Sequence, residues 1–170
     1  SNSIVISAGI KPIASFTISD TSACIKGNTI TFNNTSTSAN SIVWNFGNGQ
    51  TSTSNNNTKS YSIAGNYAVK LVATSSSGCI DSATKTIRII AQDTANFTLN
   101  GSVAFCAGDS VRLSSKSNSG NQWLFNNVVI SGATSATFIA KNSGNYRLMV
   151  ATNGCVDTSS SATITVNAVP

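Results

Sequence analysis

The chain has 170 residues, of which 29 are Ser, 20 are Thr and 21 are Asn, and it contains no Glu and no His. Charged residues make up only 9% of it, too few to cover many amphipathic helices, so the composition favours an all-β fold. Without His there is no Ser/His or Cys/His nucleophile pair, and the net charge of +5 comes from scattered bases without a basic run, so we expect neither an enzyme nor a nucleic-acid-binding protein.

Apolar residues alternate with polar ones in short segments along the first half of the chain, as they do in half-buried strands. Clusters of Gly, Asn and Ser separate the segments, as expected for turns. The alternating positions are Ile30, Phe32, Ile42, Trp44, Phe46, Tyr67, Val69, Leu71, Ile87 and Ile89. No apolar run is long enough to span a bilayer, so we expect no membrane insertion.

The second half repeats the plan of the first. The block 24–32 matches 106–113, and the block 65–82 matches 144–158, where both copies contain Gly-Asn-Tyr followed by Gly-Cys-x-Asp. The alternating positions of this half are Val111, Leu113, Trp123, Phe125, Tyr146, Leu148, Val150, Ile164 and Val166. Three matched blocks in the same order predict two tandem domains, each a sandwich of two antiparallel sheets.

This repeat sets the expected domain boundaries. We expect a linker or cloning remnant over residues 1–10, a first sandwich over 11–91, a linker over 92–95 and a second sandwich over 96–168.

The first copy resembles a polycystic kidney disease (PKD) domain, an immunoglobulin-like sandwich. The residues that carry the resemblance are Trp44, Asn45, Phe46, Gly47, Asn48 and Gly49, followed by Tyr61 and by the run from Gly65 through Tyr67 to Leu71. The family pattern has two acids where this chain has Asn45 and Asn48. Asn-Gly still suits a tight hairpin turn, but the loss of both acids argues against a metal role for the loop.

The second copy resembles a bacterial immunoglobulin-like domain, through Cys106 with Gly108-Asp109-Ser110-Val111, Trp123, and Gly144-Asn145-Tyr146. Tandem domains of these kinds resemble parts of the large secreted surface proteins of Bacteroidetes. The resemblance implies a non-catalytic spacer and adhesion segment at the bacterial cell surface or outside the cell. Its expected partners are neighbouring repeats of the same protein, with surface glycans or other proteins as further partners. The alternative function is a carbohydrate-binding module of a polysaccharide-degrading system.

The aromatic residues of the motifs have a structural interpretation. Trp44 and Trp123 share a strand face with Phe46 and Phe125, so we expect them to fill the two cores rather than to stack on a sugar. Tyr67 and Tyr146 follow a Gly at the start of a late strand, and we expect each hydroxyl to bond back to nearby backbone as a tyrosine corner.

The four cysteines, without a Cys-x-x-Cys pair, favour disulfides over zinc and so an oxidising compartment. In an immunoglobulin-like sandwich Cys24 lies at one end of the domain and Cys79 at the other. A strand of about eight residues separates the two ends and spans roughly 26 Å at ~3.3 Å per residue. A disulfide needs Cα atoms within ~7 Å, so this pair is blocked, and the same holds for Cys106 with Cys155. We therefore predict a bond between Cys24 and Cys155 across the junction, with Cys79 and Cys106 pairing with neighbouring repeats. Bonds within each domain and reduced cysteines are the alternatives.

The same placement brings Asp20, Asp93 and Asp157 to the junction. Three carboxylates from separate segments are suitable ligands for a calcium ion, so these residues are candidate calcium ligands. We expect no other cofactor. Ordinary solvated loop carboxylates are the alternative.

Overall fold

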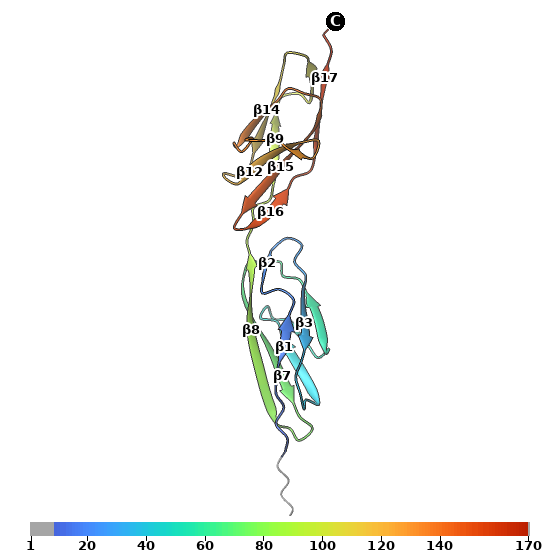
Figure 1. Ribbon diagram of the computed structural model, residues 1–170, viewed down its shortest axis with the longest axis vertical. Coiled ribbons are helices and arrows are strands. Elements are labelled where there is room, and N and C mark those ends of the chain that lie inside the picture. Colours follow the sequence, from blue (N-terminus) through green and yellow to red (C-terminus); the bar gives the residue numbers. More distant parts are fainter. Residues whose placement is uncertain (1–8, 170) are drawn as a thin grey trace, which may run out of the picture. The chain divides into compact units, whose positions relative to one another are not determined.

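The computed structural model describes residues 9–169 of the chain, which divides into two compact units between Ala91 and Gln92. Every regular element is a β-strand, and the described residues contain no helix, so none of them forms a membrane-spanning helix (Figure 1). The predicted all-β class is confirmed. The expected N-terminal linker 1–10 lies outside the described residues except for Gly9 and Ile10.

The first unit contains two sheets. One has the strand order β1-β3-β6 and the other the order β2-β8-β7-β4-β5. The strands of the first sheet are β1 (Phe16–Ile18), β3 (Ile30–Asn34) and β6 (Asn56–Lys59). Those of the second are β2 (Ser22–Cys24), β4 (Ser41–Asn45), β5 (Thr51–Ser52), β7 (Gly65–Thr74) and β8 (Ile80–Ile90).

The core of the first unit lies between these sheets because every second residue of the long strands is apolar. Phe16 and Phe32 come from one sheet and Trp44 and Leu71 from the other, and all four are fully buried. The Phe16 ring meets the Trp44 ring edge to face, with 5.1 Å between centroids, a favourable aromatic geometry. This unit is therefore a β-sandwich with an aromatic centre.

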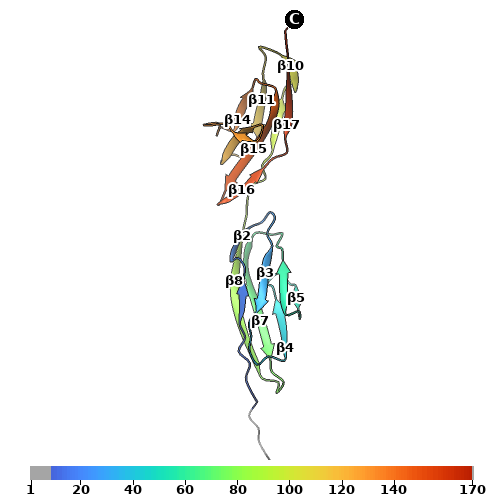
Figure 2. The same cartoon turned by 45° about the vertical axis from the view of Figure 1, so that its right-hand side comes forward.

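Strand β2 is the exception to antiparallel pairing in the first unit. It lies beside the last strand, β8 (Figure 2), and pairs with it in parallel. In this register Cys24 lies opposite Ile90. The Asp20 carboxylate accepts a hydrogen bond from the Ser22 N–H over 3.0 Å at the start of the strand. The chain thus crosses from the β1 sheet to the other sheet and places Cys24 beside the last residues of the unit.

The second unit repeats this architecture. One sheet has the order β14-β11-β9 and the other β10-β17-β15-β12-β13, with β16 also paired to β15. The first sheet contains β9 (Phe97–Asn100), β11 (Val111–Ser115) and β14 (Thr137–Ala140). The second contains β10 (Ala104–Cys106), β12 (Asn121–Phe125), β13 (Val128–Val129), β15 (Gly144–Thr152), β16 (Cys155–Thr158) and β17 (Ala162–Asn167). The prediction of two tandem sandwiches is confirmed.

Two features of the second unit position its cysteines. Strand β10 pairs in parallel with the last strand, β17, and Cys106 lies opposite Asn167, as Cys24 lies opposite Ile90 in the first unit. The segment 92–95, expected to be a linker, is part of the second unit: Ala95 is only 6% exposed and belongs to the core cluster. The chain therefore enters the second sandwich within a few residues of leaving the first.

Candidate functional site

The turn at the end of β4 contains the PKD-like motif, and the side-chain amides of Asn45 and Asn48 stabilise it. Asn45 Oδ1 accepts a hydrogen bond from the Gly47 N–H over 2.9 Å, and Asn48 Oδ1 accepts one from the Gln50 N–H over 3.1 Å. A Cβ on Gly47 would lie 3.0 Å from the Ala68 carbonyl oxygen, and φ is +77° there, so glycine is required. Both amide oxygens that replace the family's acids are thus engaged in the turn itself.

The two tryptophans are structural. Trp44 and Trp123 are fully buried, and so is Phe46 on the same face as Trp44. Each indole N–H donates to a backbone carbonyl oxygen, that of Ser54 over 3.0 Å and that of Ser135 over 2.9 Å. A buried indole with its donor satisfied cannot stack on a ligand in this conformation.

Tyr67 and Tyr146, the third residues of the long strands β7 and β15, fasten the adjoining turns. The Tyr67 hydroxyl donates to the Ile63 carbonyl oxygen over 2.7 Å, and the Tyr146 hydroxyl donates to the Asn142 carbonyl oxygen over 3.1 Å. Both bonds run to the residue four positions earlier, as in a tyrosine corner. Burial raises the pKa of the Tyr146 phenol above its ordinary value, although the bond to Asn142 acts in the opposite direction.

Asn28 and Tyr61 form a pair that the sequence did not reveal, and the Tyr61 ring packs against the Tyr67 ring with 4.4 Å between centroids. Asn28 Oδ1 accepts from the Tyr61 N–H over 2.7 Å, and Asn28 Nδ2 donates to the Tyr61 carbonyl oxygen over 2.8 Å. The Tyr61 hydroxyl donates to the Phe46 carbonyl oxygen over 3.0 Å. Burial, with a smaller contribution from Tyr67, raises the pKa of Tyr61 to about 12.

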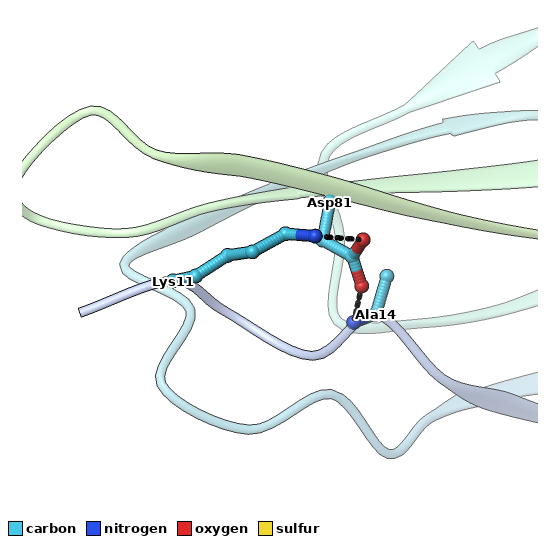
Figure 3. A network of polar contacts seen from close by, with 3 residues as sticks. All are labelled: Lys11, Ala14 and Asp81. Carbon is cyan, nitrogen blue, oxygen red and sulfur yellow. Dashed lines mark hydrogen bonds and ion pairs between the residues drawn. The ribbon is translucent and has the colours of Figure 1, made fainter.

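An aspartate holds the segment that enters each unit. In the first unit the Ala14 N–H donates to Asp81 Oδ2 over 2.8 Å, and Lys11 Nζ lies 3.3 Å from Asp81 Oδ1 (Figure 3). These two contacts, the backbone bond first, lower the pKa of the Asp81 carboxyl below its ordinary value. In the second unit the Ala95 N–H donates to Asp157 Oδ2 over 3.0 Å. We call this aspartate-to-backbone bond the entry lock.

The entry lock was missed in the sequence, although its signal is present there. Asp81 and Asp157 each stand two residues after the Cys of a Gly-Cys pair, within the strands β8 and β16. The repeated Gly-Cys-x-Asp was used to align the two copies, but the role of its Asp depends on a partner 67 residues away in the first unit and 62 residues away in the second.

The four cysteines fall into two states. Cys24 and Cys155 are disulfide-bonded, so the prediction of a disulfide is confirmed. Cys79 and Cys106 are free thiols. Neither of the alternative pairs within one unit is therefore formed in this structure, since each would need one of the two free thiols.

The three acids predicted as calcium ligands each accept a hydrogen bond within their own unit. Asp20 accepts from the Ser22 backbone, Asp157 from the Ala95 backbone, and Asp93 Oδ2 from the Ser117 hydroxyl over 3.1 Å. Among residues 9–169, no group of three or more His, Cys, Asp or Glu side chains is arranged to hold a metal ion. The calcium site stays a prediction without a cluster of ligands behind it.

Comparisons with known proteins identify the first unit. A family model described as PKD domain matches residues 10–91. The crystal structure of the PKD1 domain from the Vibrio cholerae metalloprotease PrtV has 38% sequence identity to this chain, and the match covers 47% of this chain and 98% of that domain, with a TM-score of 0.41. The chain belongs to the PKD domain family. The PKD1 domain of Vibrio anguillarum Epp has 28% identity over 50% of this chain and 100% of that domain, with a TM-score of 0.43.

The PKD domain is a small part of the curated relative. The pre-pro-metalloprotease PrtV of Vibrio cholerae is 36% identical over 89 residues, which are 50% of this chain and 9% of PrtV. The family match covers the PKD domain alone, so the more specific family of the second sandwich stays a prediction.

Neither sandwich offers an aromatic binding face. All twelve aromatic side chains lie in the described part of the chain, and each is buried or partly buried rather than exposed. One depression on the PKD domain has a volume of ≈ 570 Å³ and is open. Its lining is mostly Asn, Ser and Thr, including Asn34, Asn40 and Asn55, with no aromatic residue. A sugar ring would find hydrogen-bonding groups there but no stacking platform.

Proposed function

We propose that this chain is a non-catalytic spacer and interaction segment of a larger bacterial protein that is secreted or displayed at the cell surface. The observation that carries the proposal is the entry lock, which occurs in both units between equivalent residues, Ala14 with Asp81 and Ala95 with Asp157. This bond fixes the incoming chain against each sandwich. It is useful in a series of domains, because it limits motion where one domain follows another.

The disulfide state extends this argument to the junction. Cys24 lies opposite Ile90, one residue before the end of the PKD domain. Cys155 lies between two residues that bind the segment entering the second unit: Thr152 Oγ1 accepts from the Asp93 N–H over 3.0 Å, and Asp157 accepts from Ala95. Both cysteines are therefore tied, each by contacts within its own unit, to a stretch of chain only a few residues long. On this basis we propose that Cys24 and Cys155 are bonded to each other.

The proposed location follows from this chemistry. Disulfides persist in oxidising surroundings such as the outside of a bacterial cell. The relative that contains a matching domain is a pre-pro protein, a form whose name implies export. The relatives reported above come from Vibrio, so a Bacteroidetes source stays a prediction.

Disulfide mapping tests the proposal directly. Trypsin separates all four cysteines into different peptides, because a Lys or Arg lies between each consecutive pair. We expect the peptides of Cys24 and Cys155 to be linked in the unreduced protein and to separate on reduction. A link between Cys24 and Cys79 would contradict the proposal.

Nuclear spin relaxation tests the consequence for motion. With the bond intact, amides of both units are expected to report one shared rotational correlation time. In the double variant Cys24→Ser, Cys155→Ser the two units are expected to show shorter and separate times. The double variant Cys79→Ser, Cys106→Ser is the matched control and is expected to behave as the wild type. Equal correlation times in all three proteins would contradict a spacer role for the disulfide.

The rival function, carbohydrate binding, is tested by pull-down on insoluble polysaccharides. The described residues offer a sugar no exposed aromatic ring to stack on, so the polar depression alone would have to bind it. We expect the protein to stay in the supernatant. Retention that is competed by soluble sugar would replace the spacer proposal with the binding-module function.

A further inference from the structure

The four cysteines occupy two repeated positions. Cys24 and Cys106 each end a short strand that pairs in parallel with the last strand of its unit, opposite Ile90 and Asn167 respectively. We call this the exit position. Cys79 follows Gly78 in the hairpin between β7 and β8, and Cys155 follows Gly154 in the hairpin between β15 and β16. Each cysteine precedes the Asp of the entry lock by two residues. We call this the entry position.

One cysteine of each kind is bonded and the other is free. The exit cysteine of the first unit, Cys24, and the entry cysteine of the second, Cys155, are disulfide-bonded. The entry cysteine of the first unit, Cys79, and the exit cysteine of the second, Cys106, are free thiols. At each position the free thiol is also more exposed than its bonded counterpart: Cys79 is half-buried and Cys155 fully buried, while Cys106 is exposed and Cys24 half-buried.

The segment entering the first unit passes directly over the free entry thiol. A Cβ built on Gly9 would lie 3.3 Å from Cys79 Sγ and still closer to the Ser77 side chain, so the backbone of Gly9 lies against this thiol.

Gly9 has a defined equivalent in the second unit. The entry lock is at Ala14 in the first unit and at Ala95 in the second, and the residue five positions before Ala95 is Ile90. Counting five positions back from Ala14 gives Gly9. Ile90 is the residue beside which the exit cysteine Cys24 lies. A domain preceding the first unit with the same plan would therefore bring its own exit cysteine beside Gly9, and so beside Cys79.

We propose that Cys79 and Cys106 are covalent docking points for neighbouring domains of the same design, an inference that rests on the spacer function proposed above. Cys79 bonds to the exit cysteine of a preceding domain, and Cys106 bonds to the entry cysteine of a following one. The partner is recognised by its chemistry: a sandwich with a thiol beside its last strand or next to its entry lock.

Each bond forms by thiol–disulfide exchange with a small disulfide oxidant such as oxidised glutathione. One cysteine thiolate attacks the oxidant, which releases one glutathione thiolate and leaves a mixed disulfide. The second cysteine thiolate attacks that mixed disulfide at the protein sulfur and releases the other glutathione. Overall the two cysteines lose two protons and two electrons, and the oxidant is reduced to two thiols.

A fusion of two copies of the chain tests the proposal. The first copy ends at Asn167 and the second starts at Ile10, so that Asn167 takes the place of Gly9. Cys79→Ser in the first copy and Cys106→Ser in the second leave Cys106 and Cys79 on either side of the new junction. After oxidation with glutathione in dilute solution, we expect the number of free thiols per chain to fall from two to zero, with an intact mass lower by two hydrogens.

The matched control carries the same substitutions in the opposite copies, Cys106→Ser in the first and Cys79→Ser in the second. Its two remaining thiols lie far from the new junction, and we expect them to remain titratable or to take up glutathione. The same peptide map reports the bond between Cys24 and Cys155 in each copy. If that bond forms and the junction thiols stay unlinked, the inference is overturned while the proposed function stands. If the bond between Cys24 and Cys155 is absent, both fail.

Discussion

Asp81 and Asp157 occupy the same place in the two units: each stands two residues after a Gly-Cys pair and accepts a hydrogen bond from the backbone of the entering segment. Asp81 also pairs with Lys11, whereas Asp157 is buried with its oxygen 3.0 Å from the Ala95 nitrogen. The two sandwiches thus use the same backbone contact with different degrees of exposure. In each unit the contact is made two residues before the first strand of the main sandwich, at Ala14 before Phe16 and at Ala95 before Phe97.

The Asp81 carboxylate makes the first unit sensitive to acid. Its pKa in the folded protein is below the ordinary value of 3.8, so its contribution to stability is complete above about pH 5 and is lost as the pH falls through the folded pKa. We expect the wild-type protein to lose stability below about pH 4 more steeply than Asp81→Asn does. Urea unfolding at a series of pH values checks this.

A control with the same change of charge is available for this experiment. Asp109→Asn removes an acid from a turn of the second unit and is expected to leave the pH dependence of the first unit unchanged. If Asp81→Asn and the wild type show the same slope between pH 5 and pH 3, the entry lock does not stabilise the folded state through its charge.

The two tryptophans should act on separate units. Trp44→Phe removes the bond to the Ser54 carbonyl oxygen and part of a fully buried ring, and we expect the first unit to lose about 2 kcal/mol, since cavity formation and a lost donor both contribute. Trp123→Phe should have the same effect on the second unit. Hydrogen exchange resolved by peptide, under reducing conditions, checks this. Equal acceleration in both units by either variant would show that the cores are not independent.

We expect ionisation of the Tyr61 phenol to destabilise the first unit at alkaline pH. Tyr61 has a pKa raised from 10.0 to about 12, so the stabilisation associated with its neutral phenol is present below pH 10 and is lost as the pH rises through the folded value. The phenolate absorbance of the wild type should rise in steps, with the last step near pH 12. Tyr61→Phe should remove that step and cost about 1 kcal/mol through the lost bond to the Phe46 carbonyl oxygen. A variant that keeps the last step would assign it to another tyrosine.

The strands and cores could be predicted from the sequence because alternation is a local signal. Trp44, Leu71 and their neighbours recur at every second position, and that period alone places them on one face of a sheet. The strand Ser22–Cys24 has three residues and no alternation, so the sequence pattern did not predict this strand or its parallel pairing with β8.

The contacts that define the candidate site are long-range, which is why the sequence did not reveal them. Asn28 meets Tyr61 across 33 residues, and Ala14 meets Asp81 across 67. Neither Asn28 nor Ala14 stands out among the many Asn and small residues of this chain. Only the repeat offered a signal, because the same Gly-Cys-x-Asp appears in both copies. In each copy its aspartate accepts a hydrogen bond from the backbone N–H of an equivalent alanine, Ala14 or Ala95.

Calcium should have no effect on this protein. Asp20, Asp93 and Asp157 each accept a hydrogen bond from a donor of their own unit, and no cluster of ligands brings them together among residues 9–169. A ligand present at 100 times its Kd adds about 2.7 kcal/mol of stability. For a domain of 60 to 100 residues, each kcal/mol raises Tm by roughly 4–8 °C, so a real site would shift the melting curve by more than about 10 °C. We expect melting curves in excess calcium and in chelator to coincide. A shift of that size, abolished by Asp93→Asn and retained in Asp109→Asn, would instead establish the calcium site.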